Sequence, residues 1–144
     1  MESNSCDKKM KHLEMIEGII ERMGSNSFQL KGWAVTLVSV IGALSAQGSD
    51  KRFFLLSFIP LIAFWLLDSY YLQMERKYTV LYKNVSNKTE DTIDFDMDTR
   101  SILCSGDDAK RIKYKNCLVS KTEGLFYIVI AATVLALAII LKVF

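Results

Sequence analysis

Hydrophobic residues in this chain are gathered into long runs and are not spread at regular intervals. Two of these runs, at 32–46 and 53–67, are separated only by the short polar segment 47–52. A connection that short joins two antiparallel helices. With its flanks, each run reaches the roughly 20 apolar residues that a membrane-spanning helix needs. The pattern predicts a transmembrane hairpin with spans at 28–47 and 53–72, and the alternative is a buried hairpin in a soluble helical bundle.

A third apolar run covers 125–141 and contains no charged residue. Ser120 and Glu123, just before it, have the spacing of a capping box, in which two side chains pair with the backbone of the first helical turn. We therefore predict a C-terminal transmembrane helix at 125–144. Pro60 lies inside the second run, where we expect proline to kink the helix and free a backbone carbonyl.

The polar N-terminal segment predicts a separate amphipathic helix at 7–23. Its apolar residues recur at spacings of three and four, which is the period of one helix face. They are Met10, Leu13, Ile16, Ile20 and Met23. Gly24 is a natural C-terminal stop, and Asn26 then serves as the N-cap of the first span. We expect this N-terminal helix to lie on the membrane surface or against neighbouring subunits.

Beyond the second span, we expect the helix to continue to about Asn84. The pattern then changes, because 92–98 alternates between apolar and acidic residues and 111–115 alternates between basic and apolar residues. A period of two indicates strands, and opposite charges across the pair predict a short β-hairpin. The alternative is a disordered loop. The predicted fold class is an all-α membrane protein in four segments: 1–27, 28–72, 73–124 and 125–144.

The distribution of positive charge predicts how the chain is oriented. Lys and Arg number five in 1–31, two in the turn at 51–52 and ten in 73–124. The positive-inside rule then places the N-terminus and the polar segment 73–124 in the cytoplasm and the C-terminus outside. The net charge of +2 is too small to indicate nucleic-acid binding. The three apolar runs make the lipid bilayer the expected partner.

Asp68 is the main candidate for a functional residue, because an ionisable side chain at the edge of a span is costly. It either lines a water-filled path or pairs with Lys31 on the same side of the bilayer. The alternative is an ordinary interfacial carboxylate exposed to headgroups and water. The other polar residues that we predict to line a pore are Thr36, Ser39, Gln47 and Ser57.

The sequence carries no recognisable catalytic, metal or cofactor motif. Asp94, Asp96 and Asp98 suggest calcium, but Thr99 and Ser105 stand where an EF-hand loop needs Gly and Glu. His12 has no cysteine or serine partner in view, and we expect it to be a solvated surface residue. The three cysteines lack metal-ligand spacing. We predict that the protein is not an enzyme and binds no metal or cofactor.

Two further sets of residues are predicted to make contacts between helices or between proteins. Small residues four apart let helix backbones approach closely in lipid, within the hairpin or between subunits. These packing candidates are Ser39, Gly42, Ala43, Ala46, Ala132 and Ala136. The charged residues predicted to contact a cytoplasmic partner are Glu75, Arg76, Lys77, Arg111, Lys113 and Lys115.

The strings NSFQLKGW and FWLLDSYYLQMER resemble small bacterial membrane proteins, some of which are encoded beside anti-phage systems. The organisation of 16–85 is also similar to the membrane accessory protein of RNA-targeting CRISPR systems. That resemblance implies an oligomeric pore that disturbs the bacterial inner membrane. A ribonuclease-type Arg/His motif has been suggested for that family, but no arginine precedes His12 at a suitable spacing.

Two hypotheses of function follow. The first is a homo-oligomeric, pore-forming or membrane-disturbing effector or accessory protein in anti-phage defence. The second is a non-conducting membrane adaptor that anchors a cytoplasmic protein partner through 73–124.

Overall fold

The computed structural model describes residues 2–46, 55–100, 102 and 106–140, and within these ranges the chain is helical with no strand. The long helices are α1 (Glu2–Ala46), α2 (Phe58–Asn87) and α5 (Lys121–Ile140). The short ones are the 3-10 turn η2 (Glu90–Thr92), α3 (Gly106–Arg111) and α4 (Tyr114–Leu118). All three long helices are long and apolar enough to cross a membrane. The all-helical class with three such helices is therefore confirmed.

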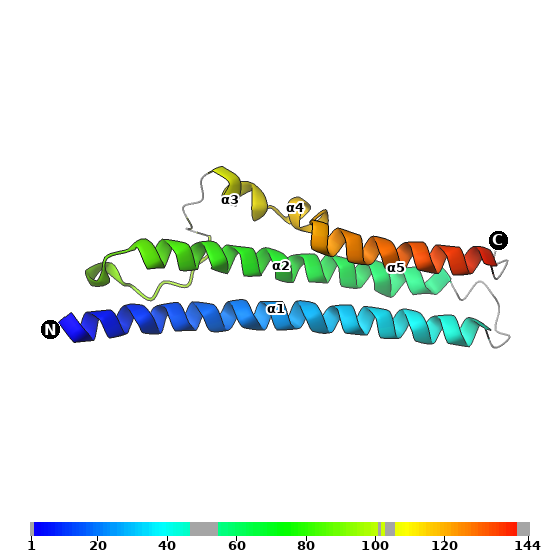
Figure 1. The fold of residues 1–144 in the computed structure, drawn as a ribbon, viewed down its shortest axis with the longest axis horizontal. Helices are drawn as coiled ribbons and strands as arrows, with labels where there is room; N and C mark the ends of the chain where they lie inside the picture. The colour runs from blue at the N-terminus through cyan, green and yellow to red at the C-terminus, as the bar shows by residue number, and fades with distance from the viewer. Residues whose placement is uncertain (1, 47–54, 101, 103–105, 141–144) are drawn as a thin grey trace.

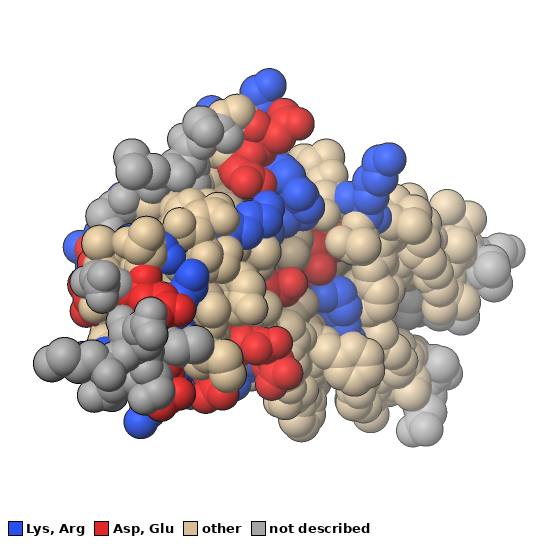
Figure 2. Space-filling model, turned by 60° about the vertical axis from the view of Figure 1, so that its left-hand side comes forward, with Lys and Arg blue, Asp and Glu red and all other residues tan. Residues whose placement is uncertain are grey.

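The three long helices lie side by side, with α2 in the middle (Figure 1). α1 runs along almost the whole of α2, and α5 lies along the half of α2 that is farthest from the N-terminus. Figure 2 shows that charged side chains gather over one end of the molecule and leave the other end apolar. The apolar end holds a packing centre of Ala34, Leu61 and Tyr127, one residue from each long helix.

The charged end has its own core, because α1 and α2 extend well beyond their apolar runs. Ile16 of α1 packs there against Leu81 and Val85 of α2. The chain after α2 folds back over this core and covers it with side chains such as Met97. Lys9 links the N-terminal part of α1 to the end of α2, since its Nζ donates to the carbonyls of Ser86 and Lys88, both at 2.9 Å.

The predicted break near Gly24 is wrong, because α1 is one continuous helix through Gly24 and Asn26. Both of its halves pack against α2, and this burial outweighs the modest helical cost of one glycine. The kink expected at Pro60 is also wrong. α2 begins at Phe58, so Pro60 lies in the first turn, where its missing N–H interrupts no helical hydrogen bond.

The β-hairpin is not found in the described residues. Residues 111–115 comprise the end of α3, a short turn and the start of α4, and the Cys117 N–H donates to the Lys113 carbonyl at 3.1 Å. In 92–98 the aspartates explain the irregular backbone, because Asp96 Oδ1 accepts the Asp98 N–H at 2.8 Å and Asp98 Oδ1 accepts the Arg100 N–H at 2.8 Å. Such local bonds replace a strand ladder.

His12 is fully buried, so the expectation of a solvated surface histidine is wrong. Its Nε2 lies 3.2 Å from the Asp96 carbonyl oxygen. Its ring lies against Phe95, with the ring centroids 5.3 Å apart. The segment after α2 therefore covers His12. The hydrophobic periodicity of α1 alone does not predict this contact, because the covering residues are distant in sequence.

Candidate functional site

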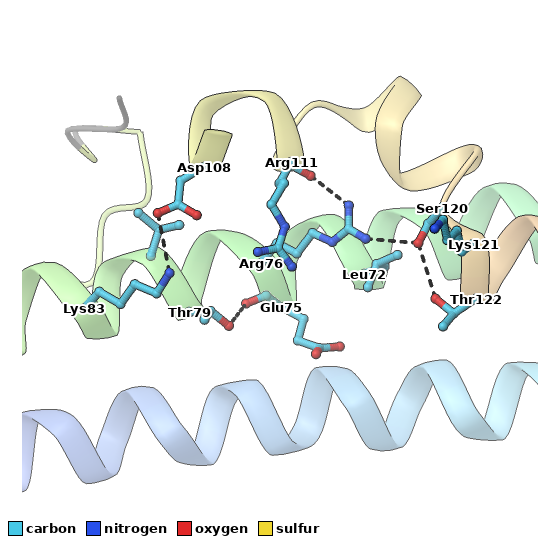
Figure 3. Close-up of a pocket in the computed structure, with 11 residues that line it drawn as sticks. Leu72, Glu75, Arg76, Thr79, Lys83, Asp108, Arg111, Ser120, Lys121 and Thr122 are labelled. Carbon is cyan, nitrogen blue, oxygen red and sulfur yellow. Dashed lines mark hydrogen bonds and ion pairs between the residues drawn. The ribbon is translucent and has the colours of Figure 1, made fainter. Parts of the chain in front are cut away.

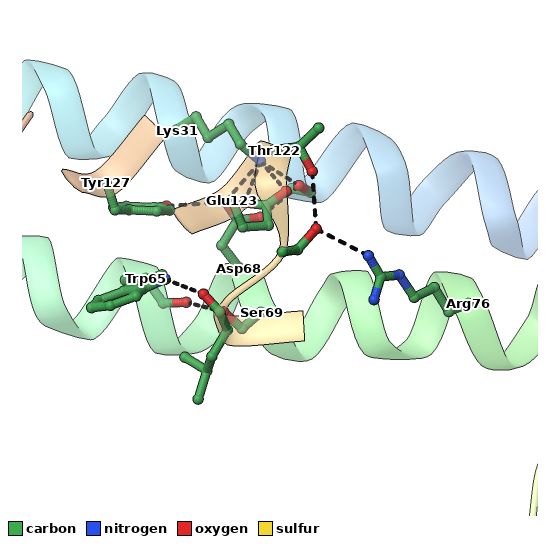
Figure 4. Close-up of polar contacts among 11 residues, drawn as sticks. Lys31, Trp65, Asp68, Ser69, Arg76, Thr122, Glu123 and Tyr127 are labelled. Atoms are coloured by element: carbon green, nitrogen blue, oxygen red, sulfur yellow. Dashed lines mark hydrogen bonds and ion pairs between the residues drawn. The ribbon is translucent and has the colours of Figure 1, made fainter. Parts of the chain in front are cut away.

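A cluster of ionisable side chains lies where the three long helices meet (Figure 4). Lys31 of α1 directly precedes the first apolar run, Asp68 of α2 directly follows the second, and Glu123 of α5 precedes the third. Because α2 runs antiparallel to α1 and α5, these three positions come to the same level along the bundle. We call Lys31, Asp68 and Glu123 the charged junction.

Lys31 is the centre of the charged junction. Its Nζ lies 2.8 Å from Asp68 Oδ2 and 2.9 Å from Glu123 Oε2. The two carboxylates are almost entirely buried, with exposed side-chain fractions of 0% for Asp68 and 5% for Glu123, while Lys31 is 21% exposed. One ammonium group therefore serves two buried acids.

Hydroxyl groups complete the shell around Asp68. Ser27 Oγ donates to Asp68 Oδ1 at 2.5 Å, and the Tyr127 hydroxyl donates to Asp68 Oδ2 at 3.1 Å. Lys31 Nζ also donates to Ser27 Oγ at 2.8 Å. Buried charge is tolerated when it is paired and its remaining lone pairs are satisfied, and Asp68 meets both conditions.

The tyrosine ring is fixed by its own packing. Tyr127 stacks on Trp65 of α2, with centroids 6.2 Å apart and an interplanar angle of 22°. The Trp65 indole N–H donates to the Leu118 carbonyl at 3.2 Å. The charged junction therefore lies beside a stacked pair of aromatic rings, and the hydroxyl of one of them bonds to Asp68.

The segment containing α3 and α4 is tied along α2 next to the charged junction, and we call 106–120 the strap. Side chains of α2 donate to strap carbonyls: Gln73 Nε2 to Ile112 at 2.8 Å and Arg76 to Arg111 at 2.9 Å. In return, the Tyr114 hydroxyl donates to the Leu66 carbonyl at 2.9 Å. The bonds to Ile112 and Arg111 satisfy carbonyl groups at the end of α3 that have no partner within that short helix.

Cys117 is the buried residue of the strap. Its Sγ lies 3.6 Å from an Arg76 guanidinium nitrogen and 3.6 Å from the Arg111 carbonyl oxygen. Burial raises the pKa of the Cys117 thiol, against the opposing effect of Arg76. A buried protonated thiol is unreactive, so we treat Cys117 as a packing residue.

The polar residues predicted to line a pore do not come together. Asp68 lies in the charged junction, Ser57 is buried, and Thr36 and Ser39 are exposed on α1. The Thr36 hydroxyl donates to the Gly32 carbonyl of its own helix at 2.8 Å, so its hydrogen bond is made within α1. Gln47 lies outside the described residues.

The predicted packing residues fall into two groups. Ser39, Gly42 and Ala43 line an apolar groove of about 350 Å³ between α1 and α5. Ala132 and Ala136 are exposed on α5, so they make no close seam within the described part of one chain. The side-chain environment of Ala46 lies outside what the structure describes.

The charged residues predicted to contact a partner also fall into two groups, one held within the fold and one exposed. Arg76 is engaged by the strap, and Glu75 is half-buried near α1, with its Oε2 3.9 Å from where a Cβ on Gly24 would lie. Lys77 is half-buried. Arg111, Lys113 and Lys115 are exposed on the strap, as a contact surface requires.

Sequence reasoning missed Glu123 as a member of the charged junction. The capping-box interpretation is wrong, because Ser120 N donates to the Cys117 carbonyl at 3.1 Å and the Glu123 carboxylate turns to Lys31. Ser27 and the hydroxyl of Tyr127 were missed as well. One sequence feature points to the cluster. Each of the three apolar runs has an ionisable residue within two positions of one of its ends, and antiparallel packing of α2 brings these three ends to the same level.

No family model matches this chain, and no curated protein or solved structure matches it.

Proposed function

We propose that this chain is a membrane protein that assembles from several copies and makes the bacterial inner membrane permeable, as an effector or accessory protein in anti-phage defence. The N-terminus and the strap then lie in the cytoplasm, and the C-terminus lies outside. The observation that carries the proposal is the charged junction. Ionisable groups placed inside or at the edge of membrane spans are costly, and they commonly mark ion paths or elements that move.

The composition of the charged junction supports a role beyond packing. Two buried carboxylates share the single ammonium group of Lys31. An apolar contact of the same size would hold three helices together at lower desolvation cost. We infer that the charged junction holds the closed arrangement of α1, α2 and α5, and that its rearrangement exposes the polar groups near the membrane boundary.

Conduction requires more than one chain in this proposal. The groove between α1 and α5 is lined mainly by apolar and small residues, including Val35, Val134 and Gly42. A water path therefore has to be built between chains. The same groove, with small residues on α1, is the surface that we propose for close approach of a second copy.

The proposal is tested by measuring membrane potential with a voltage-sensitive dye in cells that express the full chain. We expect the wild type to depolarise the membrane, and Asp68→Asn to change the rate of depolarisation several-fold. Glu14→Gln is the matched control, because Glu14 is an exposed carboxylate on α1 and its replacement removes the same charge. Unchanged potential, with the protein shown to be in the membrane, would count against a pore.

A non-conducting adaptor is the second candidate, and the strap favours it. Arg111, Lys113 and Lys115 are exposed and form a basic surface on an element that is fixed against α2. Reversing these three charges should abolish capture of an acidic partner and leave membrane potential unchanged if the protein is an adaptor. A pore should respond mainly to Asp68→Asn.

A further inference from the structure

A second polar site lies beside the charged junction, on the strap side of α2. It is a cavity of about 430 Å³ between α2, α3 and the first turn of α5 (Figure 3). Leu72 and Val80 are apolar members of its lining. The polar lining includes hydroxyl groups from Thr79, Ser120 and Thr122.

The cavity carries an excess of positive charge. Four of its residues are cationic, namely Arg76, Lys83, Arg111 and Lys121. Its two acidic residues do not balance them. Asp108 already pairs with Lys83 at 3.5 Å, and the carboxylate of Glu75 turns away toward α1 (Figure 3).

Two of the four cations are available to a ligand. Within the described parts of the chain, the side chains of Arg111 and Lys121 have no hydrogen-bond or ion-pair partner, and both residues are exposed. Figure 3 shows the Arg111 side chain extending toward α2 beside Arg76. Two guanidinium groups that approach each other are stabilised by an anion between or beside them.

Arg76 is held in place before any ligand arrives. One of its terminal nitrogens donates to the Arg111 carbonyl at 2.9 Å, and the other donates to Ser120 Oγ at 3.0 Å. A fixed guanidinium loses little conformational entropy on binding, and its planar shape suits phosphate oxygens. α5 also begins here, at Lys121, so the positive end of its dipole adds to the potential.

The position of the cavity along the bundle indicates which anion it meets. Lys121 and Thr122 lie one turn outside the apolar run that begins at Leu125, and Leu72 ends the predicted second span. This is the depth at which lipid phosphates lie when the helices cross a bilayer. Basic pockets next to membrane helices on the cytoplasmic side bind anionic headgroups.

We propose that this cavity binds a phosphate group, supplied either by the headgroup of an anionic lipid or by a soluble phosphate compound. Arg76 provides the fixed part of the site, and Arg111 and Lys121 close on the phosphate from the strap and from α5. The proposal does not depend on whether the protein conducts ions. A lipid phosphate bound in this cavity contacts the strap through Arg111. The position of the strap is then linked to the lipid composition of the membrane.

The test uses the purified full chain in detergent, with two probes. Native mass spectrometry counts bound phosphatidylglycerol in competition with phosphatidylcholine, and calorimetry measures binding of sodium pyrophosphate. The test variant is Arg111→Ala with Lys121→Ala. The matched control is Lys113→Ala with Lys115→Ala, which removes the same charge from exposed positions on the strap.

We expect the test variant to bind its probe about thirtyfold more weakly than the wild type, because it lacks two basic residues and each is worth about 1 kcal/mol toward an anionic lipid. The control should stay within about twofold of the wild type. Selective loss of phosphatidylglycerol assigns the site to lipid, and selective loss of pyrophosphate assigns it to a soluble compound. Equal losses in both variants, or no binding of either probe by the wild type, would overturn the proposal.

Discussion

Lys31 of α1 and Asp68 of α2 form an ion pair of 2.8 Å in which the carboxylate is completely buried. The pair is not isolated, since the same ammonium group lies 2.9 Å from Glu123 of α5. Removing the cation and removing one acid are therefore different perturbations. The first leaves two buried carboxylates without a counter-charge, and the second leaves a balanced pair.

We expect Lys31→Met to destabilise the protein by about 3–5 kcal/mol, the usual effect of leaving buried charge unpaired. Asp68→Asn should be milder, about 1–3 kcal/mol, because Lys31 keeps Glu123 and the main loss is hydrogen bonding. The measurement is unfolding from mild detergent into sodium dodecyl sulfate, followed by helical circular dichroism.

Lys11→Met is the control for this series, because Lys11 is an exposed cation on α1. It should shift the free energy of unfolding by less than about 0.5 kcal/mol. Adding Glu123→Gln to Lys31→Met should restore part of the lost stability, since one of the two unpaired acids is then neutral. If Lys31→Met behaves like its control, the charged junction does not hold the helices together.

Tyr127→Phe isolates the hydroxyl that donates to Asp68 Oδ2 at 3.1 Å. The ring keeps its stacking on Trp65, so the expected loss is that of one hydrogen bond to a charged group, about 1.5–3 kcal/mol. Tyr70→Phe serves for comparison, because Tyr70 is 46% exposed. Equal stability of the two variants in the same unfolding assay would show that the Tyr127 hydroxyl contributes nothing.

The helical class and the three apolar runs are predictable from sequence because run length is a local property. The position at which α1 ends is not set by local sequence alone. Gly24 suggests a helix C-terminus, but a glycine within a helix costs only about 1 kcal/mol relative to alanine. Packing on both sides of Gly24 against α2 exceeds that cost, and the sequence of α1 alone does not contain it.

The two errors after α2 have a different cause, which is competition for the same polar atoms. Alternating aspartates match a strand period, yet Asp96 and Asp98 bond to backbone N–H groups two residues ahead. Glu123 matches a capping box, yet its carboxylate bonds to Lys31. In both cases the spacing identifies the residue, and only the surrounding structure decides which partner it takes. Lys31 as a partner of Asp68 was among the sequence-based alternatives, and the structure contains that pair.

Cys117 should react slowly with a water-soluble maleimide in a chain whose other two cysteines are replaced by serine. Burial excludes the reagent and raises the pKa of the thiol, so less thiolate is present at a given pH. The sign follows directly: a raised pKa moves the rise in labelling rate to higher pH than for an ordinary cysteine.

Val119→Cys in a chain with Cys117→Ser is the comparison, since Val119 is 80% exposed and lies two positions away on the same segment. We expect Cys117 to be labelled at least about tenfold more slowly than this exposed thiol at neutral pH, and the two rates to converge in sodium dodecyl sulfate. Similar rates in mild detergent would mean that the strap is not closed over α2.

Gly24→Ala tests whether α1 is one helix. In the structure Gly24 is helical, and among the described residues outside its own helical turn an added Cβ would meet only Glu75 Oε2, at 3.9 Å, which is ordinary contact. Alanine should therefore stabilise the protein by about 0.5–1 kcal/mol, because it lowers the entropy of the unfolded chain and favours helix.

Gly106→Ala supplies the opposite case. Gly106 has a φ of 64°, in the left-handed region that alanine avoids, so the same substitution should cost about 1 kcal/mol. Both variants are measured in the same unfolding assay. A helix that ended at Gly24 with a left-handed cap would make the two substitutions change stability in the same direction. Opposite signs require that the backbone runs through Gly24 as helix, which is what brings Lys31 to the level of Asp68.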